Sequence, residues 1–264
     1  MMIDGHVHTQ YCPHGSDHKM EAYVKVAIDK GIHAITFTEH APLPIEDTVP
    51  TKDSAMAKNT VYEYLKEAKG LQAKYGHKIH INAGFEIDYI EGKEQETQLF
   101  LEQYPEAIPH SILSVHFLKL PDGSYYCIDY SKESFIEKAE EVGFDTLYKL
   151  YESTVRKALS NPYGELTPKK IGHINLIHKF SKGYDYTDPI NWKKLLTLAK
   201  KNQYKLDYNF AGMDKVYYGR TYPDGDILKE AKQLELVLET GSDAHRPEEV
   251  GRYFTEGENG HGRN

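Results

Sequence analysis

Histidine residues with the spacing of metal ligands stand near the start of the chain. His6 and His8 are separated by one residue within a short apolar stretch, residues 3–7, that we predict to be a buried strand. Because side chains alternate along a strand, both imidazoles point to the same side. Neutral imidazole is the commonest metal ligand in proteins, and two rings on one face can chelate a divalent ion. Taken alone, the pair fits a packed strand as well as it fits a metal site.

Further potential metal ligands recur at the carboxyl ends of other predicted strands. Together with the first pair and the nearby His14 they make nine donors: His6, His8, His14, His40, Glu86, His116, His173, Asp243 and His245. A carboxylate buried without a partner is costly, so Glu86 and Asp243 require a cation. Nine donors exceed what one ion needs, and a set of imidazoles and carboxylates without thiolate suits Mn, Fe or Zn. The pattern therefore predicts two to three divalent transition-metal ions.

Strands and helices alternate along most of the chain. Apolar runs predict strands at residues 3–7, 34–38, 79–85, 112–115, 171–172, 205–209 and 236–240, with a turn at residues 120–123. Helical spacing predicts helices at residues 20–30, 54–75, 93–104, 132–161 with a break at Gly143, 191–202 and 225–233. This alternation favours an α/β fold with a parallel sheet, and about seven such units can close into a barrel. Active sites of α/β barrels lie at the carboxyl ends of the strands, where the nine donors stand.

The composition limits the class of protein. The chain has 264 residues, 39% of them hydrophobic, so we predict one domain over residues 1–264, with a polar tail after about residue 254 that frays. A net charge of −8 and a pI near 6.0 argue against nucleic-acid binding. No apolar run is long enough to span a membrane, and no signal peptide precedes the first strand. We therefore expect a cytoplasmic protein with no membrane contact, and the oligomeric state stays open.

The two cysteines, Cys12 and Cys127, are too few for a disulfide framework. Free thiols are expected for both. Cys12 lies close to the predicted ligands, but a thiol without a partner motif is interpreted as a small packed side chain.

Seven short motifs carry a resemblance to a known family. They are DGHVH at residues 4–8, CPHG at 12–15, FTEHAP at 37–42, GFEI at 84–87, SVH at 114–116, GHIN at 172–175 and GSDAHRP at 241–247. In these motifs the chain resembles the PHP (polymerase and histidinol phosphatase) superfamily. The CPHG and DAHRP contexts, with NFAG at 209–212 and TYP at 221–223, are similar to its histidinol-phosphate phosphatase branch.

The resemblance implies a distorted (β/α)7 TIM-like barrel with a trinuclear metal site at the carboxyl end of the strands. By motif, the first metal would take His6, His8, Glu86 and Asp243, the second would share Glu86 and add His116 and His173, and the third would take His14, His40 and His245. The catalytic residues would be Glu86, Asp243 and His40.

The resemblance also implies an activity, the metal-dependent hydrolysis of the small phosphate monoester L-histidinol phosphate in histidine biosynthesis. A hydroxide bridging two ions would attack the phosphorus, and the ions would absorb charge on its oxygens. Cations would orient the phosphate; the possible residues are Arg156, Lys215, Arg220, Arg246 and Arg252, and from these we select Arg156, Lys215 and Arg220. Two alternatives remain, another PHP-type phosphoesterase (a phosphodiesterase, a nuclease or another small phosphomonoesterase) and a non-catalytic metal-stabilised module. The proline-rich loop after His40 and residues 118–128 are predicted to wall a compact pocket.

Overall fold

A parallel sheet of seven strands forms the centre of the protein, which is described here by a computed structural model over residues 1–255. The strands follow the order β1 (Ile3–Val7), β2 (Ala34–His40), β3 (His80–Asp88), β4 (Ile112–Ser114), β7 (Lys170–Ile171), β8 (Lys205–Asn209) and β9 (Leu238–Gly241). The segment after β9 returns to β1, because Asp243 N donates to His6 O and His8 N donates to Ala244 O, both at 2.8 Å. The sheet thus nearly closes, and the predicted (β/α)7 TIM-like barrel is confirmed. The tail predicted to fray falls almost entirely outside the described residues.

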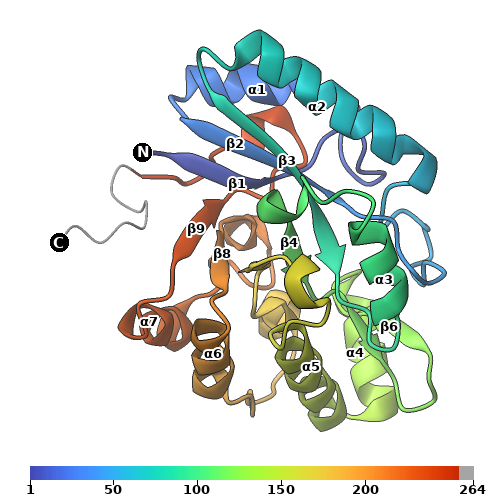
Figure 1. Ribbon diagram of the computed structural model, residues 1–264. Helices are drawn as coiled ribbons and strands as arrows, with labels where there is room; N and C mark the ends of the chain where they lie inside the picture. The colour runs from blue at the N-terminus through green and yellow to red at the C-terminus, as the bar shows by residue number, and fades with distance from the viewer. Residues whose placement is uncertain (256–264) are drawn as a thin grey trace.

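Within residues 1–255, seven helices cover the outside of the sheet (Figure 1). They are α1 (Met20–Asp29), α2 (Val61–Tyr75), α3 (Glu94–Leu101), α4 (Lys132–Val142), α5 (Phe144–Ala158), α6 (Trp192–Lys201) and α7 (Gly225–Gln233). Each buries side chains on one face; in α5 the buried residues Leu147, Tyr151 and Val155 recur every four positions. The predicted break at Gly143 separates α4 from α5, and its φ of 92° explains the glycine. No helix within residues 1–255 has the length and apolar character that crossing a membrane requires.

Helix α2 begins later than predicted, at Val61 instead of residue 54, after a short 3₁₀ turn (Lys58–Thr60). The reason is local hydrogen bonding that competes with a helix. The Asp47 carboxylate accepts from the Ser54 amide at 2.8 Å, and the Met56 amide donates to His40 O at 3.1 Å. These bonds hold residues 47–56 in a loop beside the end of β2.

Two further differences concern strands. Strand β3 continues to Asp88, because its pairing with β2 reaches Glu86 and its pairing with β4 reaches Asp88. Glu86 therefore lies within the strand instead of after it. The predicted turn at residues 120–123 joins two short antiparallel strands that were not predicted, β5 (Phe117–Lys119) and β6 (Tyr125–Cys127). With three residues each, they are too short to show an alternating pattern in the sequence.

A buried ion pair lies near the amino ends of the barrel strands. Lys170, only 6% exposed, donates to Glu239 Oε1 at 2.6 Å and to Gly5 O at 2.7 Å. A side chain at position 5 would displace this ion pair, because a Cβ there would stand 2.6 Å from Glu239 Oε1 and 3.0 Å from Lys170 Nζ. Glu239 also meets Lys205, a half-exposed residue, at 3.3 Å. Burial alone would raise the pKa of Glu239, but the charges of Lys170 and Lys205 hold it at about 2.

We expect Lys170→Met to lower the free energy of unfolding by about 3 kcal/mol at neutral pH, since it leaves a buried carboxylate with weaker pairing. Lys205→Met, which removes the exposed partner of the same carboxylate, should cost less than about 1 kcal/mol. Because the folded pKa of Glu239 is depressed, its contribution is present above the unfolded value of about 4.3 and is lost as the pH falls toward about 2. Urea unfolding of the metal-free proteins at pH 7 and pH 3 measures both effects. Equal losses in the two variants at pH 7 would contradict the buried pair.

Candidate metal centre and active site

Four donor atoms converge where β1 and β3 meet the segment that follows β9. His6 Nε2 lies 3.0 Å from His8 Nε2, 3.2 Å from Glu86 Oε2 and 3.6 Å from Asp243 Oδ1. His8 Nε2 lies 3.3 Å from both carboxylate oxygens. Donors around a tetrahedral ion with bonds of about 2.1 Å stand about 3.4 Å apart. These residues, implied by the resemblance as the first ligand set, therefore fit one divalent ion.

The other oxygen of Glu86 faces the second implied set. Glu86 Oε1 lies 2.9 Å from His173 Nε2 and 3.6 Å from His116 Nε2, and it accepts a hydrogen bond from Ser114 Oγ at 2.7 Å. Gly172 makes this arrangement possible, because a Cβ there would stand 2.0 Å from Ser114 Oγ. One carboxylate thus presents an oxygen to each set, which is the geometry of a bridging ligand.

The third implied set of ligands is more exposed to solvent than the other two. His14 is exposed, and its Nε2 lies 3.2 Å from His245 Nε2, while the ring centres of His14 and His40 are 5.1 Å apart. His40 Nδ1 also lies 3.3 Å from Glu86 Oε2, so His40 stands between this set and the other two. The Cys12 thiol is buried, as expected for a packed residue, but it lies within 4.8 Å of ligand atoms of His8, His40 and His245. The structure thus brings all nine predicted donors to one end of the barrel.

Carboxylates that the sequence analysis missed orient two of these histidines. His6 Nδ1 is 2.8 Å from Asp207 Oδ2, and His116 Nδ1 is 2.7 Å from Asp88 Oδ1. Such partners fix the ring orientation and tautomer of a metal-binding histidine. A signal existed for Asp88, which follows Glu86 by two positions and so shares its face of β3. The sequence carried no such signal for Asp207, because its contact with His6 crosses the barrel interior and forms only when the sheet closes into a barrel.

The carboxylates at the centre are ionised. Burial alone would raise the pKa of Glu86 and of Asp243, but neighbouring imidazoles, led by His6, hold both well below their ordinary values. Burial would lower the pKa of His8, but its hydrogen bonds to Asp243 and Glu86 raise it to about 9. Protons and metal ions compete for the same ring nitrogens. The negative charge that raises the histidine pKa is therefore the charge that attracts a divalent cation.

We expect Asp207→Asn to weaken metal binding about 10- to 100-fold, because it removes the carboxylate that orients His6. Asp188→Asn is a matched control. Asp188 Oδ2 pairs with His178 Nε2 at 2.9 Å, and neither residue lines the cavity beside the donors. Titration against a chelating indicator measures the affinity of each variant, and a similar loss in both would show that the effect is general destabilisation.

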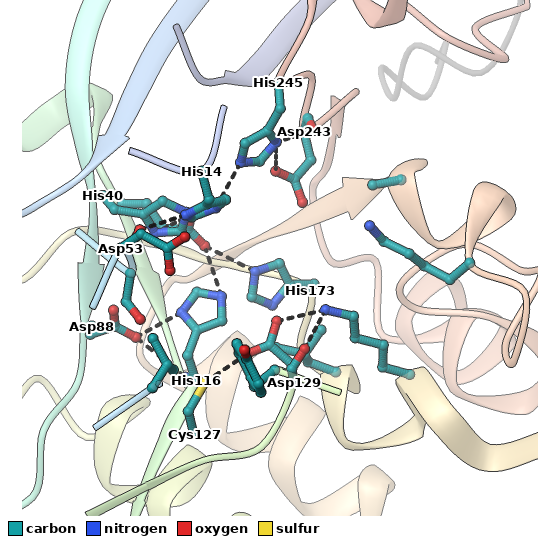
Figure 2. A pocket seen from close by; sticks show the side chains of 18 of the residues that line it. His14, His40, Asp53, Asp88, His116, Cys127, Asp129, His173, Asp243 and His245 are labelled. Carbon is teal, nitrogen blue, oxygen red and sulfur yellow. Dashed lines mark hydrogen bonds and ion pairs between the residues drawn. The ribbon is translucent and has the colours of Figure 1, made fainter. Parts of the chain in front are cut away.

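A cavity of about 500 Å³ opens beside the donors (Figure 2). Its walls include Val49, Asp53 and Ser54 from the loop after β2, and Phe117, Cys127 and Asp129 from the β5–β6 region. Figure 2 shows His40, His116, His173 and His245 around the cavity. The two segments predicted to wall a pocket therefore both contribute to it.

The candidate phosphate-binding cations lie in different places. Lys215 lines the cavity, and although it is open to solvent, the surrounding protein lowers its pKa by desolvation. Arg156 is exposed on α5, 3.4 Å from Ser153 Oγ, and Arg220 is bound to Asp224 at 2.7 Å; neither lines the cavity. The structure therefore does not bring these two arginines to the site.

Cations that were not selected from the sequence do line the cavity. Lys179 Nζ lies 2.9 Å from Asp129 Oδ2, and Arg252 is held by Asp214 at 2.8 Å and Glu249 at 3.1 Å. Lys179 belongs to the 3₁₀ segment Leu176–Gly183. In the sequence, the signal that Lys179 could reach the site was its position after a predicted barrel strand.

Comparison with known proteins places this geometry in a family. The model of the PHP domain matches residues 4–214, and that of a PHP-associated region matches residues 227–262. The chain belongs to the PHP domain family. It is 40% identical over 255 residues to the histidinol-phosphatase of Bacillus subtilis, covering 94% of this chain and 95% of that one. A probable histidinol-phosphatase of Deinococcus radiodurans is 28% identical, covering 97% and 90% of the two chains.

Solved structures share the fold. A putative histidinol phosphatase from Listeria monocytogenes superposes with a TM-score of 0.87 at 31% identity, covering 95% of this chain and 98% of that one. A histidinol phosphate phosphatase from Lactococcus lactis, solved in complex with zinc, L-histidinol and phosphate, has a TM-score of 0.65 at 22% identity, with 93% and 87% covered. At that identity the second likeness supports the barrel alone.

Proposed function

We propose that this PHP protein is a metal-dependent phosphomonoesterase that hydrolyses L-histidinol phosphate to L-histidinol and phosphate, a step of histidine biosynthesis. The observation that carries the proposal is the Glu86 carboxylate, which presents one oxygen to each of two donor sets beside a cavity lined by cations. The choice of substrate is supported by the 40% identity to a histidinol-phosphatase over nearly the whole chain. A structural metal site has no need of nine donors and an open cavity.

The residues would hold two to three ions of Mn, Fe or Zn. His6, His8, Glu86 and Asp243 would hold the first, Glu86, His116 and His173 the second, and His14, His40 and His245 the third. Bound divalent metals supply Lewis acidity and a water acidic enough to give a nucleophile near neutral pH.

The side chains of the chain itself bind and orient the phosphate. A monoester dianion approaching the ionised Glu86 and Asp243 would be repelled without bound cations. Lys215 adds positive charge on the side of the cavity, and together with Lys179 and Arg252, which are paired with carboxylates, it would turn the phosphoryl group toward the donor sets. Arg252 is held by two carboxylates and so is positioned before the substrate arrives.

The cavity suits a small leaving group. Val49, Phe117 and Leu176 give the cavity apolar walls, which suit a ring. Asp129 adds an acidic side chain, which suits an ammonium group. Nucleic acid requires a basic track along the surface, whereas this chain has a net charge of −8. We therefore propose a small phosphate monoester as the partner, with no nucleic acid and no membrane involved.

Steady-state kinetics on protein loaded separately with manganese, iron(II) and zinc test the proposal. The substrates should include L-histidinol phosphate, para-nitrophenyl phosphate, a cyclic diester and single-stranded DNA. We expect kcat/KM to be highest for L-histidinol phosphate. A higher value for DNA or the diester would leave only the metal-hydrolase class, and no turnover of any substrate would favour a non-catalytic module.

A further inference from the structure

A buried tyrosine in the cavity has a hydroxyl group without a partner. Tyr222 is 2% exposed and lines the cavity, yet its hydroxyl makes no hydrogen bond with any part of the chain that the structure describes. Leaving a buried polar group unpaired costs about 1–3 kcal/mol, so a partner supplied by a ligand is expected. The ring lies edge-on to that of His173, with the ring centres 6.2 Å apart. The hydroxyl-bearing side chain is therefore beside the second donor set.

The backbone and the ring of Tyr222 are held in place from several sides. Its amide and carbonyl exchange hydrogen bonds of 2.9 and 2.8 Å with Asn209, whose side chain in turn donates to Asp243 Oδ2 at 3.1 Å. The ring stacks on Tyr218 at 4.5 Å with an interplanar angle of 10°. Gly212 admits it, because a Cβ at that position would stand 2.7 Å from the Tyr222 ring. The side chain is thus preorganised before any ligand binds.

We propose that the Tyr222 hydroxyl donates a hydrogen bond to the phosphoryl group of the substrate, and that Tyr222 is a phosphate-binding residue of this site. At an ordinary pKa of about 10 a phenol keeps its proton at neutral pH, so it can donate to an oxyanion. Tyr222 and Lys215 border the same cavity and belong to one short stretch after β8. A neutral donor and a cation would then approach one dianion together. The inference rests on the proposed function only in taking the ligand to be a phosphate.

The neighbouring Tyr218 provides a matched control. Its hydroxyl donates to Asp224 Oδ1 at 2.6 Å and is also 2.9 Å from Thr221 O, and it does not line the cavity. Tyr218→Phe therefore removes a structural hydrogen bond, whereas Tyr222→Phe removes a hydroxyl that has no partner in the protein. We expect Tyr218→Phe to lower Tm with little change in phosphate affinity, and Tyr222→Phe to keep the wild-type Tm or raise it.

Calorimetric titration of the metal-loaded proteins with inorganic phosphate tests the inference without relying on turnover. We expect Tyr222→Phe to raise the Kd for phosphate about 10- to 100-fold, the range for a hydrogen bond to a charged group, while metal content stays at the wild-type level. A Kd within twofold of wild type would overturn the inference. If wild type binds phosphate but turns over neither monoester, the proposed function fails while this test still stands.

Turnover of two substrates shows which part of the substrate the hydroxyl meets. L-Histidinol phosphate carries an ammonium group and an imidazole, and para-nitrophenyl phosphate carries neither. Contact with the phosphoryl group predicts the same fractional loss of kcat/KM for both substrates in Tyr222→Phe. A loss confined to L-histidinol phosphate would mean that the hydroxyl reads the amine or the ring, which would overturn the inference.

Discussion

Replacement of Glu86 by alanine should remove more than one metal ion per chain and lower kcat/KM by about 10³-fold or more. The reason is the position of the two carboxylate oxygens. Oε2 lies within 3.3 Å of ring nitrogens of His6, His8 and His40, and Oε1 lies 2.9 Å from His173. Removing this one side chain takes a negative ligand from two donor sets at once, and it leaves crowded imidazoles without their counter-charge.

His14→Ala is the comparison that gives the Glu86 result its meaning. His14 is exposed; its Nε2 lies 3.2 Å from His245 Nε2, its ring lies beside that of His40, and its Nδ1 lies 2.8 Å from Asp53 O. We expect this variant to lose mainly one ion and to keep the other two donor sets intact. Elemental analysis of both purified variants gives the metal content, and circular dichroism checks that each is folded. Equal metal loss in folded samples of the two would refute the bridging position of Glu86.

The barrel and the donors at its strand ends were predictable because both follow from local periodicity. A strand alternates with period two, so His6 and His8 share a face without knowledge of any distant residue. Parallel strands joined by helices end at the same edge of the sheet, so donors that follow successive strands converge. His40 and Glu86 illustrate this, since the register of β2 with β3 places them directly opposite each other. That the whole chain is one domain stays a prediction, although strands from Ile3 to Gly241 share one sheet.

The phosphate-binding side of the cavity was less predictable, because it depends on the directions of long side chains. Arg156 is exposed near the end of α5 and does not line the cavity, and the sequence of an amphipathic helix does not show which exposed side chains reach a site. Lys179 and Arg252 come from irregular segments whose paths are decided by tertiary contacts, such as the hydrogen bond from Arg252 Nε to Ser242 O at 2.9 Å. The Tyr222 hydroxyl is a candidate for ligand binding because it has no hydrogen-bond partner among the described residues, and only the folded structure shows this.

Lys215→Met should lower kcat/KM for phosphate monoesters about 10- to 100-fold while metal content stays unchanged. Lys215 lines the cavity and makes no ion pair with any carboxylate among residues 1–255, so its charge is available to a ligand. Desolvation lowers its pKa, and a phosphate dianion would offset that effect. Since the residue is open to solvent and unpaired, methionine should change the free energy of unfolding by less than about 0.5 kcal/mol.

Arg220→Met separates a specific cation from the general effect of lost charge. Both substitutions remove one positive charge from the same loop region after β8, but Arg220 is bound to Asp224 and lies outside the cavity. A long-range effect of charge would slow both variants by similar factors and would fade in high salt, since exposed charges are screened beyond about 10 Å at 0.1 M ionic strength. Direct contact with the phosphoryl group predicts instead that Lys215→Met alone loses activity, with KM for L-histidinol phosphate rising as well. If Arg220→Met loses as much as Lys215→Met and both losses persist in high salt, Lys215 is not the specific phosphate contact and the cavity is not where the monoester binds.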